Sequence, residues 1–226
     1  KSPQIKLTDD DDAAIYFSSG TTGFPKAILH NHESLIHAFG TAGTGGFGIK
    51  SDSLGSYSSY LQWVITIFML IFGVNFNLYY LLLIGKVRDV LRSEEFKSYF
   101  LIIALAVGFV FLSLMGRFEA FPQVYTAEEA FRHSLFQVAS LMTTAGFTTT
   151  DYDVWPMLGK TALILVMFIG AMAGSTAGGM KISRIIISLK GAYINVRKLI
   201  NPRYVPKAKF EGKTLEQKTI DDVFAY

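Results

Sequence analysis

The sequence Leu141-Met-Thr-Thr-Ala-Gly-Phe-Thr-Thr-Thr-Asp151 is a polar, glycine-centred stretch between two long apolar segments. An earlier stretch, Thr41-Ala-Gly-Thr-Gly-Gly-Phe-Gly48, has the same core. Phe47 and Phe147 are 100 residues apart, each follows a glycine, and a long apolar run begins 14 residues after each of them, at residues 61 and 161. The repeat indicates that the two stretches are loops with the same role in two similar units.

The composition favours a membrane protein. Of the 226 residues, 50% are hydrophobic and 17% are charged, whereas a soluble domain has about 25% charged residues. Three runs without a charged residue, at 61–84, 99–115 and 161–180, approach or exceed the roughly 20 apolar residues that a helix needs to cross a bilayer. We therefore predict an all-α, multi-pass membrane protein in a lipid bilayer, with buried helices of a large soluble protein as the alternative.

Residues 126–160 have the pattern of a re-entrant pore hairpin. Thr126 and Glu129 have the spacing of a capping box, which predicts that a helix begins at residue 127. An amphipathic helix over residues 127–142 is too short to cross a bilayer and leads directly into the loop at 143–147. A half-length helix followed by a glycine loop and a long apolar run is typical of a re-entrant hairpin. A helix on the outer membrane surface is the alternative.

The third apolar run is interrupted at residues 170–181, where four glycines fall between residues 170 and 179. Glycine weakens a helix by about 1 kcal/mol per residue, so we expect irregular backbone there. Such backbone is tolerated at membrane depth only where it lines a cavity or is packed in protein. Gly174 and Gly178 also have the spacing of a small-residue seam between packed helices, and spacing alone leaves both interpretations open.

Basic residues predict the orientation. Lys and Arg cluster in a connector at residues 86–97 and in the tail that begins at Lys181. Because cytoplasmic flanks carry an excess of these residues, both segments are predicted to be cytoplasmic, and both glycine loops then lie on the outer face. No aromatic or groove-reading motif accompanies the basic residues, so no nucleic-acid partner is expected.

The two glycine loops have the chemistry of a cation site. Backbone carbonyls and threonine hydroxyls can replace the water around an ion, and the C-terminal end of a preceding helix adds negative potential. Gly46 and Gly146 are expected to have positive φ angles, and Phe47 and Phe147 to pack behind the loops as braces. Three carboxylates either attract cations at the outer mouth or are simply solvated: Asp52, Asp151 and Asp153.

The first 38 residues differ in character from the rest. A short strand is expected at residues 13–17, followed by Ser18-Ser-Gly-Thr-Thr-Gly-Phe-Pro-Lys26, whose hydroxyls, N–H groups and lysine suit phosphate oxygens. This string resembles the signature loop of AMP-forming acyl-CoA synthetases and related adenylate-forming ligases, which binds the ATP phosphates. Residues 27–38 resemble the helix that follows this loop. The residues matched to phosphate binding are Ser18, Ser19, Gly20, Thr21, Thr22, Gly23 and Lys26.

The ligase resemblance stops after residue 38, and the adenine-binding segments, acyl pocket and C-terminal lid are missing. We therefore expect no adenylation, no enzyme activity and no working ATP site. The alternative is a ligase fragment, with ATP phosphates bound by residues 18–26, fused to a membrane segment. His30, His32 and His37 lack carboxylate or cysteine companions and are expected on a helix surface rather than at a metal.

From Phe39 onward the sequence resembles the membrane subunit of the Trk/Ktr/HKT potassium transporter family, in particular its TrkH-like branch. That family builds one pore from four repeats of span, pore helix, filter and span. The resemblance implies potassium uptake across the plasma (inner) membrane, and a homodimer with a cytoplasmic nucleotide-binding regulatory subunit. The strings that carry it are residues 39–48, Gly73-Val-Asn-Phe-Asn77, residues 131–140, residues 143–151 and Gly174-Ser-Thr-Ala-Gly-Gly-Met-Lys181.

Matched residue by residue, the resemblance implies two filter segments and a gate. Potassium is expected at the filter and at no other metal site, although carbonyl loops of this composition also fit sodium. The filter residues are Thr44, Gly45, Gly46 and Phe47 in one loop and Thr144, Ala145, Gly146 and Phe147 in the other. The gate residues are Gly174, Ser175, Thr176, Ala177, Gly178, Gly179 and Lys181.

The predicted domain organisation joins a ligase-like segment to part of a transporter, which makes the chain chimeric. By this resemblance, the first repeat, the first span and most of the pore helix of the second repeat, and the fourth repeat are missing, and two filter segments of four cannot close a ring. We therefore expect the fragment alone to be inactive; a membrane-anchored protein without any activity is a third hypothesis. The parts are residues 1–38, and then 39–226, comprising the end of repeat two (39–97), repeat three (98–200) and a cytoplasmic tail (201–226).

Overall fold

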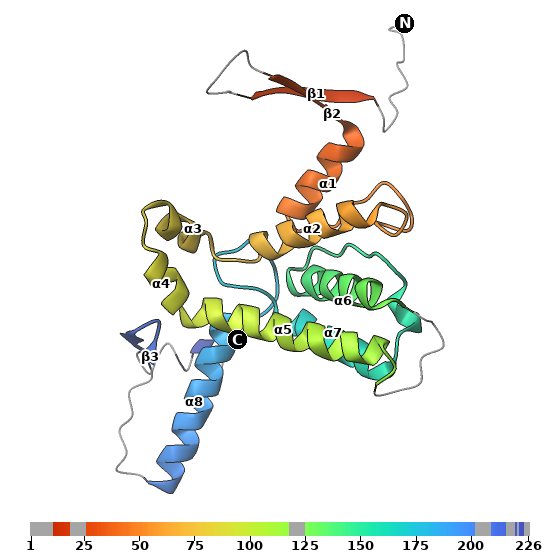
Figure 1. The fold of residues 1–226 in the computed structure, drawn as a ribbon. Coiled ribbons are helices and arrows are strands. Elements are labelled where there is room, and N and C mark those ends of the chain that lie inside the picture. The colour runs from red at the N-terminus through yellow and green to blue at the C-terminus, as the bar shows by residue number, and fades with distance from the viewer. Residues whose placement is uncertain are drawn as a thin grey trace, which may run out of the picture.

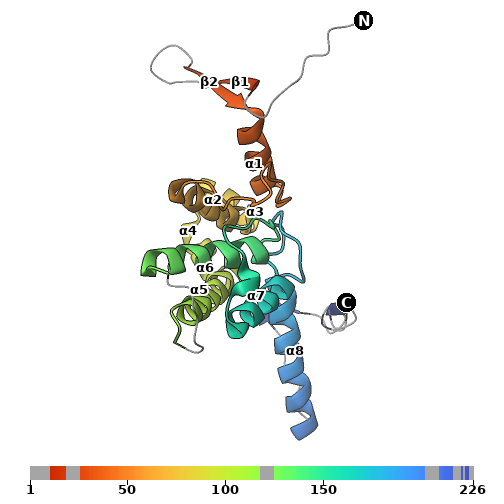
Figure 2. The same ribbon diagram turned by 90° about the vertical axis from the view of Figure 1, so that its right-hand side faces the viewer.

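The computed structural model describes residues 11–18, 26–117, 125–201, 209–215, 220 and 222–223. Among these residues, eight helices form the body and two small antiparallel β-hairpins lie at its edges (Figures 1 and 2). The helical body agrees with the predicted class, and the hairpins are local additions to it. In chain order the elements are β1 (Asp12–Ser18), β2 (Lys26–Asn31), α1 (His32–Ala42), α2 (Ser59–Phe72), α3 (Phe76–Leu83), α4 (Val87–Arg92), α5 (Glu94–Leu114), α6 (Ala127–Met142), the 3-10 turn η1 (Tyr152–Val154), α7 (Met157–Ile169), α8 (Ile182–Ile200), β3 (Lys209–Phe210) and β4 (Lys213–Thr214).

Helix α5 is the central helix of the body. It begins five residues before the predicted start at residue 99, because Ser93 caps it by accepting the Phe96 N–H at 3.1 Å. Of the helices in the described ranges, α5 alone is long and apolar enough to cross a membrane by itself. A buried stripe of α5 packs against α6 and α7 and comprises Tyr99, Ile103, Val107, Val110 and Leu114.

The expectation of an unbroken first span is wrong. Residues 61–84 fold as α2 and α3, which meet at a 90° bend. The described chain therefore contains one candidate span, or two if this bent pair is counted as one. The third predicted span is divided as expected, into the 13-residue α7 and the longer α8, by the non-helical residues 170–181.

Hydrogen bonds to the 170–181 loop explain the bend between α2 and α3. The Met172 N–H donates to the Gly73 carbonyl at 3.2 Å, and the Phe76 N–H donates to the Gly174 carbonyl at 3.1 Å. The side chain of Asn75 caps α3, because its Oδ1 accepts the Asn77 N–H at 2.9 Å. Each interruption thus supplies partners for backbone groups of the other, which irregular backbone needs at membrane depth.

Helix α6 has the predicted bounds, and its capping box is present. The Glu129 N–H donates to Thr126 Oγ1 at 3.3 Å, and the Thr126 N–H donates to the Glu129 carboxylate at 2.9 Å. These two bonds satisfy helix-end N–H groups locally, so the start of α6 does not depend on the rest of the fold.

A side chain at position 73 would have no room. A Cβ on Gly73 would lie 2.3 Å from the Tyr99 hydroxyl oxygen and 2.9 Å from Thr143 Cγ2. We expect Gly73→Ala to lower the free energy of unfolding by about 1–3 kcal/mol, measured by thermal unfolding in detergent. Tyr99→Phe alone loses the bond to the Leu70 carbonyl (3.0 Å) but should recover part of the loss in the Gly73→Ala chain. Additive losses would contradict the clash.

Candidate functional site

The two glycine loops have the same backbone hydrogen bonds at an offset of 100 residues. In each loop, the first N–H donates to the carbonyl four residues before it, and the third and fourth both donate to a single carbonyl of the preceding helix. The repeat in the sequence is therefore also a repeat in structure. The pairs, donor first, are Gly43–Phe39, Thr44–Thr41, Gly45–Gly40 and Gly46–Gly40, and Thr143–Ala139, Thr144–Leu141, Ala145–Ser140 and Gly146–Ser140.

The loops also share their unusual backbone angles. Gly46 and Gly146 have φ angles of 63° and 81°, in the left-handed region, as expected from the sequence. Thr44 and Thr144 also have positive φ, 51° and 57°, although each carries a branched side chain. A threonine in this region is rare, and such strain persists only where surrounding contacts hold it.

The two loops lie against each other. A Cβ on Gly46 would be only 2.1 Å from the carbonyl oxygen of Ala145, so the first loop can approach the second because residue 46 has no side chain. Past the loops, the Leu54 N–H donates to the Thr148 carbonyl at 2.9 Å, and the Thr148 N–H donates to Ser53 Oγ at 3.1 Å. The structure therefore brings the two predicted filter segments together.

The predicted gate loop contacts both glycine loops through equivalent threonines. Thr44 Oγ1 donates to the Thr176 carbonyl at 3.2 Å. Thr144 Oγ1 accepts the Gly178 N–H at 2.7 Å. The 170–181 loop thus bonds to residues 44 and 144, and its first part, at Met172 and Gly174, bonds to the break between α2 and α3.

The two phenylalanines differ. Phe147 is fully buried, packs 6.0 Å from the His37 ring between centroids, and its carbonyl accepts the Ser140 hydroxyl at 2.7 Å. Phe47 is 71% exposed, so the prediction that both rings brace their loops is wrong for Phe47 within the described chain. A Cβ on Gly40 would lie 3.1 Å from the Phe147 ring, so the first helix leaves room for the second loop's phenylalanine.

A buried histidine that the sequence analysis did not single out supports the second loop. His133 Nδ1 is 2.8 Å from Thr149 Oγ1, just after the loop. Burial, and then the charge of Arg132, lower the pKa of His133 to about 4, so the ring is neutral at pH 7. His133 and Gln137 are four residues apart and so lie on one face of α6. This pair of polar residues is the signal in the sequence that could have identified His133 as a residue that supports the loop.

Three carboxylates line a cavity of about 500 Å³ beside the loops, together with Thr148, Thr149 and Thr150. Asp151 also caps the turn that follows, because its side chain accepts the Asp153 N–H at 2.9 Å. The three acidic residues therefore lie at one cavity, and one of them has a structural role as well. The three are Asp52, Asp151 and Asp153.

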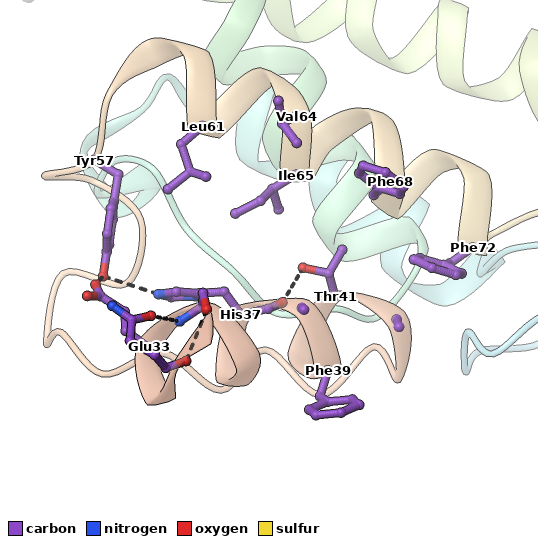
Figure 3. A pocket seen from close by; sticks show the side chains of 14 residues that line it. Glu33, His37, Phe39, Thr41, Tyr57, Leu61, Val64, Ile65, Phe68 and Phe72 are labelled. Carbon is purple, nitrogen blue, oxygen red and sulfur yellow. Dashed lines mark hydrogen bonds between the residues drawn. The ribbon is translucent and has the colours of Figure 1, made fainter. Parts of the chain in front are cut away.

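An apolar groove of about 640 Å³ separates α1 from α2 (Figure 3). Leu61, Val64 and Phe68 of α2 line it, and a polar cluster closes one end. In that cluster, His37 Nε2 is 3.1 Å from the Tyr57 hydroxyl, which donates to the Glu33 carboxylate. In the other unit, α5 packs against the matching helices α6 and α7.

The N-terminal segment does not fold as the ligase resemblance implies. Residues 27–38 were expected to be one helix, but β2 pairs with β1 over residues 26–31 and α1 begins at His32. Backbone pairing joins Ser18 to Lys26 at the end of this hairpin. The other residues matched to phosphate binding, Ser19, Gly20, Thr21, Thr22 and Gly23, lie outside the described residues, as do the side chains of Ser18, Lys26 and His30.

Helix α1 crosses the proposed boundary at residues 38 and 39 without interruption and leads into the first glycine loop. His37, expected on a helix surface, is instead buried. The helix is held from both ends, because the Asn31 side chain accepts the Ser34 N–H at 2.8 Å and the Gly43 N–H closes the last turn. Helix α1 precedes the first loop as α6 precedes the second, so the expectation that most of the helix before the first loop is missing is wrong.

Apolar helices, irregular backbone that bridges their interruptions, and paired threonine–glycine loops define a membrane transport protein. A family model described as TrkH, cation transport protein, matches residues 14–226. The chain belongs to this family, whose members are transporters and not enzymes.

Named relatives agree with the family assignment. The chain is 34% identical over 219 residues to the Trk system potassium uptake protein TrkH of Vibrio parahaemolyticus, covering 95% of this chain and 42% of that protein. It is 32% identical over 197 residues to TrkH of Escherichia coli K12, covering 86% and 40%. The crystal structure of the potassium transporter TrkH from Vibrio parahaemolyticus superposes with a TM-score of 0.77 at 32% identity, over 86% of this chain and 42% of that one.

The chain thus spans about 42% of the first relative's length. The family match begins at residue 14, within the segment assigned to the ligase resemblance, and the ligase hypothesis gains no support.

Alanine at Gly46 and Gly146, the glycines of the two predicted filter loops, should separate the cost of backbone strain from the cost of a steric clash. Either substitution forces a positive φ on a residue with a Cβ, which costs about 1–2 kcal/mol. Nothing lies within 4 Å of a Cβ at Gly146, whereas a Cβ at Gly46 meets the Ala145 carbonyl. We expect Gly46→Ala to lower the unfolding temperature clearly more than Gly146→Ala. Gly108→Ala, in open space on α5, is the control and should be neutral or stabilising; equal losses at Gly46 and Gly146 would contradict the loop contact.

Acid should weaken the packing around His133. The folded-state pKa of His133 is about 4, below the ordinary 6.5, so the unfolded chain binds its proton first as pH falls. Stability from this group is fully present above about pH 6.5 and is lost toward pH 4, with a loss of about 1 kcal/mol at pH 5 after allowance for partial exposure. His133→Gln should show a smaller drop in unfolding temperature between pH 7 and pH 5; an unchanged drop would contradict this assignment.

Proposed function

We propose that this chain is part of a potassium-uptake subunit of the plasma (inner) membrane, and that residues 44–47 and 144–147 are two segments of its filter. One observation carries the proposal: two loops 100 residues apart have identical backbone hydrogen bonding and lie in contact. Similarity to potassium uptake proteins is the reason for proposing that the ion is potassium.

The chemistry of the loops suits a dehydrated cation. Their N–H groups are used by the helices before them, through the carbonyls of Gly40 and Ser140. Within the described ranges, no hydrogen bond reaches the backbone carbonyls of residues 44–46 or 144–146. These oxygens, with the negative C-terminal ends of α1 and α6 beside them, are the groups that replace the hydration shell of an ion.

We propose that the loop at 174–181 is the gate. It is hydrogen-bonded to the equivalent threonines Thr44 and Thr144, one from each filter segment. A shift of this loop therefore changes contacts of both filter segments together, which a control element needs. The bonds that join Met172 to Gly73 and Gly174 to Phe76 tie any such shift to the bend between α2 and α3.

The ring around the ion requires more chain than is present here. Two filter segments supply only part of a closed set of ligands, and the α1–α2 groove lacks the helix that α5 provides for α6 and α7. We propose that the additional length of the relatives supplies both, and that residues 39–97 and 98–200 are parts of two repeats. The homodimer and the cytoplasmic nucleotide-binding regulatory subunit belong to the proposal for the complete protein.

Grafting tests the proposal. Residues 14–226 should replace the matched segment of Escherichia coli TrkH in cells that lack potassium uptake, and rubidium uptake should be measured. The graft should restore uptake, because the host supplies the remaining filter segments, whereas the 226-residue chain alone should give none.

Gly146→Ser in the graft should reduce uptake by at least about tenfold, because a strained residue at 146 displaces the carbonyls. Gly108→Ala in the graft is the matched control and should retain uptake. Uptake that is equal in the Gly146→Ser and Gly108→Ala grafts would contradict the assignment of residues 144–147 to a filter.

A further inference from the structure

A buried carboxylate on α5 binds both ends of the gate loop. Glu95 is only 5% exposed. Its Oε1 accepts the Ala173 N–H at 2.8 Å and the Ser183 N–H at 3.1 Å. These two residues flank the segment 174–181, so a single side chain fixes where the irregular loop begins and where it ends.

The bond to Ser183 supplies a cap that α8 does not have. The N-cap residue of α8 is Lys181, which makes no side-chain capping bond and has a φ of 75°. The first N–H groups of a helix lack partners within it, and a negative charge is favoured beside them. Glu95, from another helix, takes the place of a local cap, so the start of α8 depends on where α5 holds this carboxylate.

The start of α5 is held in the same manner by the C-terminal hairpin. Glu211 Oε1 accepts the Ser93 hydroxyl at 2.8 Å and the Glu95 N–H at 3.0 Å. Glu211 is in the tight turn between β3 and β4, where it and Gly212 have φ angles of 50° and 74°. A glutamate in this region is strained, and here its side chain reaches the end of a different helix.

The β3–β4 hairpin packs against α8. Phe210 and Leu215 pack against the buried Ile187 and Ile194 of α8. Lys190 of α8 donates to the Lys209 carbonyl at 2.7 Å and also pairs with Glu94 on α5. The hairpin therefore bridges the first turn of α5 and the middle of α8 (Figure 1).

We propose that Glu95 is the positioning residue of the gate loop and that Glu211 couples the C-terminal hairpin to it through the shared first turn of α5. The two glutamates form a relay of helix caps. Displacement of the hairpin removes the cap from α5, and Glu95 then holds Ala173 and Ser183 less firmly. This inference rests on the proposed function only in naming the 174–181 segment a gate; the coupling itself is a property of the chain.

The test uses the absence of cysteine from the sequence. Ala177→Cys places a single thiol in the loop at a position that is 5% exposed. The full 226-residue chain in liposomes is treated with a polar maleimide, and the labelling rate reports how often the loop opens. Glu95→Ala should raise the rate by about tenfold, and Glu211→Ala by about threefold, because each removes hydrogen bonds to a charged group.

Neighbouring residues give matched controls. Lys97→Ala, at an exposed position near the start of α5, and Lys213→Ala, at an exposed position on the same hairpin, do not touch the loop or the cap of α5 and should label within about twofold of the parent chain. Glu211→Ala should add nothing further in the Glu95→Ala chain, since the relay passes through Glu95. If the two caps served only stability, the effects of Glu95→Ala and Glu211→Ala on the labelling rate would be independent of each other.

The proposal is overturned if Glu95→Ala labels like Lys97→Ala, if Glu211→Ala labels like Lys213→Ala, or if the effects of Glu95 and Glu211 are independent. If Glu95→Ala does not fold, Glu95→Gln retains an acceptor oxygen without the charge and should label about threefold faster than the parent; a parental rate would overturn the proposal. Failure of the proposed function is distinguishable, because a graft that transports no rubidium leaves the labelling pattern unchanged.

Discussion

Backbone amide groups inside a bilayer have no water to bind, so every interruption of a helix there must find partners within the protein. The fold depends on this constraint. Two apolar runs are interrupted, one at Gly73–Asn75 and one at residues 170–181, and the interruptions hydrogen-bond to each other through Met172 and Phe76. Neither is stable as irregular backbone without the other. The bend of α2–α3 and the position of the 170–181 loop are therefore one structural feature.

The two repeated loops have the same backbone hydrogen bonds, but the residues around them differ. Both loops use the same donors and acceptors, yet Ser140 binds the Phe147 carbonyl while the matching residue, Gly40, has no side chain and accommodates the Phe147 ring. Phe147 is consequently buried between the two units, and Phe47 faces outward. A repeated loop can thus keep its backbone geometry while its supporting residues diverge, because the proposed ion ligands are backbone carbonyls, which every residue type provides.

Local signals predicted what local interactions determine. The capping box fixed α6 to the residue, and the spacing of the glycines gave the loops and the interruption at residues 170–181. The 90° bend, the exposure of Phe47 and the caps from Glu95 and Glu211 were beyond the sequence, since each depends on residues 70 to 120 positions away. A charge-free run of 24 residues satisfies the length rule for a span without revealing that Asn75 starts a new helix within it.

The N-terminal segment shows that a short string has to be interpreted together with the structure around it. In P-loop and dinucleotide-binding folds, the phosphate loop runs directly from a strand into a helix whose N-terminus faces the phosphates. Here Lys26 opens a strand that returns along the first one, and the helix begins only at His32. That helix is committed elsewhere, because its buried His37 packs on Phe147 and its C-terminal end leads into the first glycine loop. Residues 32–42 therefore belong structurally with the loop they support, whatever the origin of the residues before them.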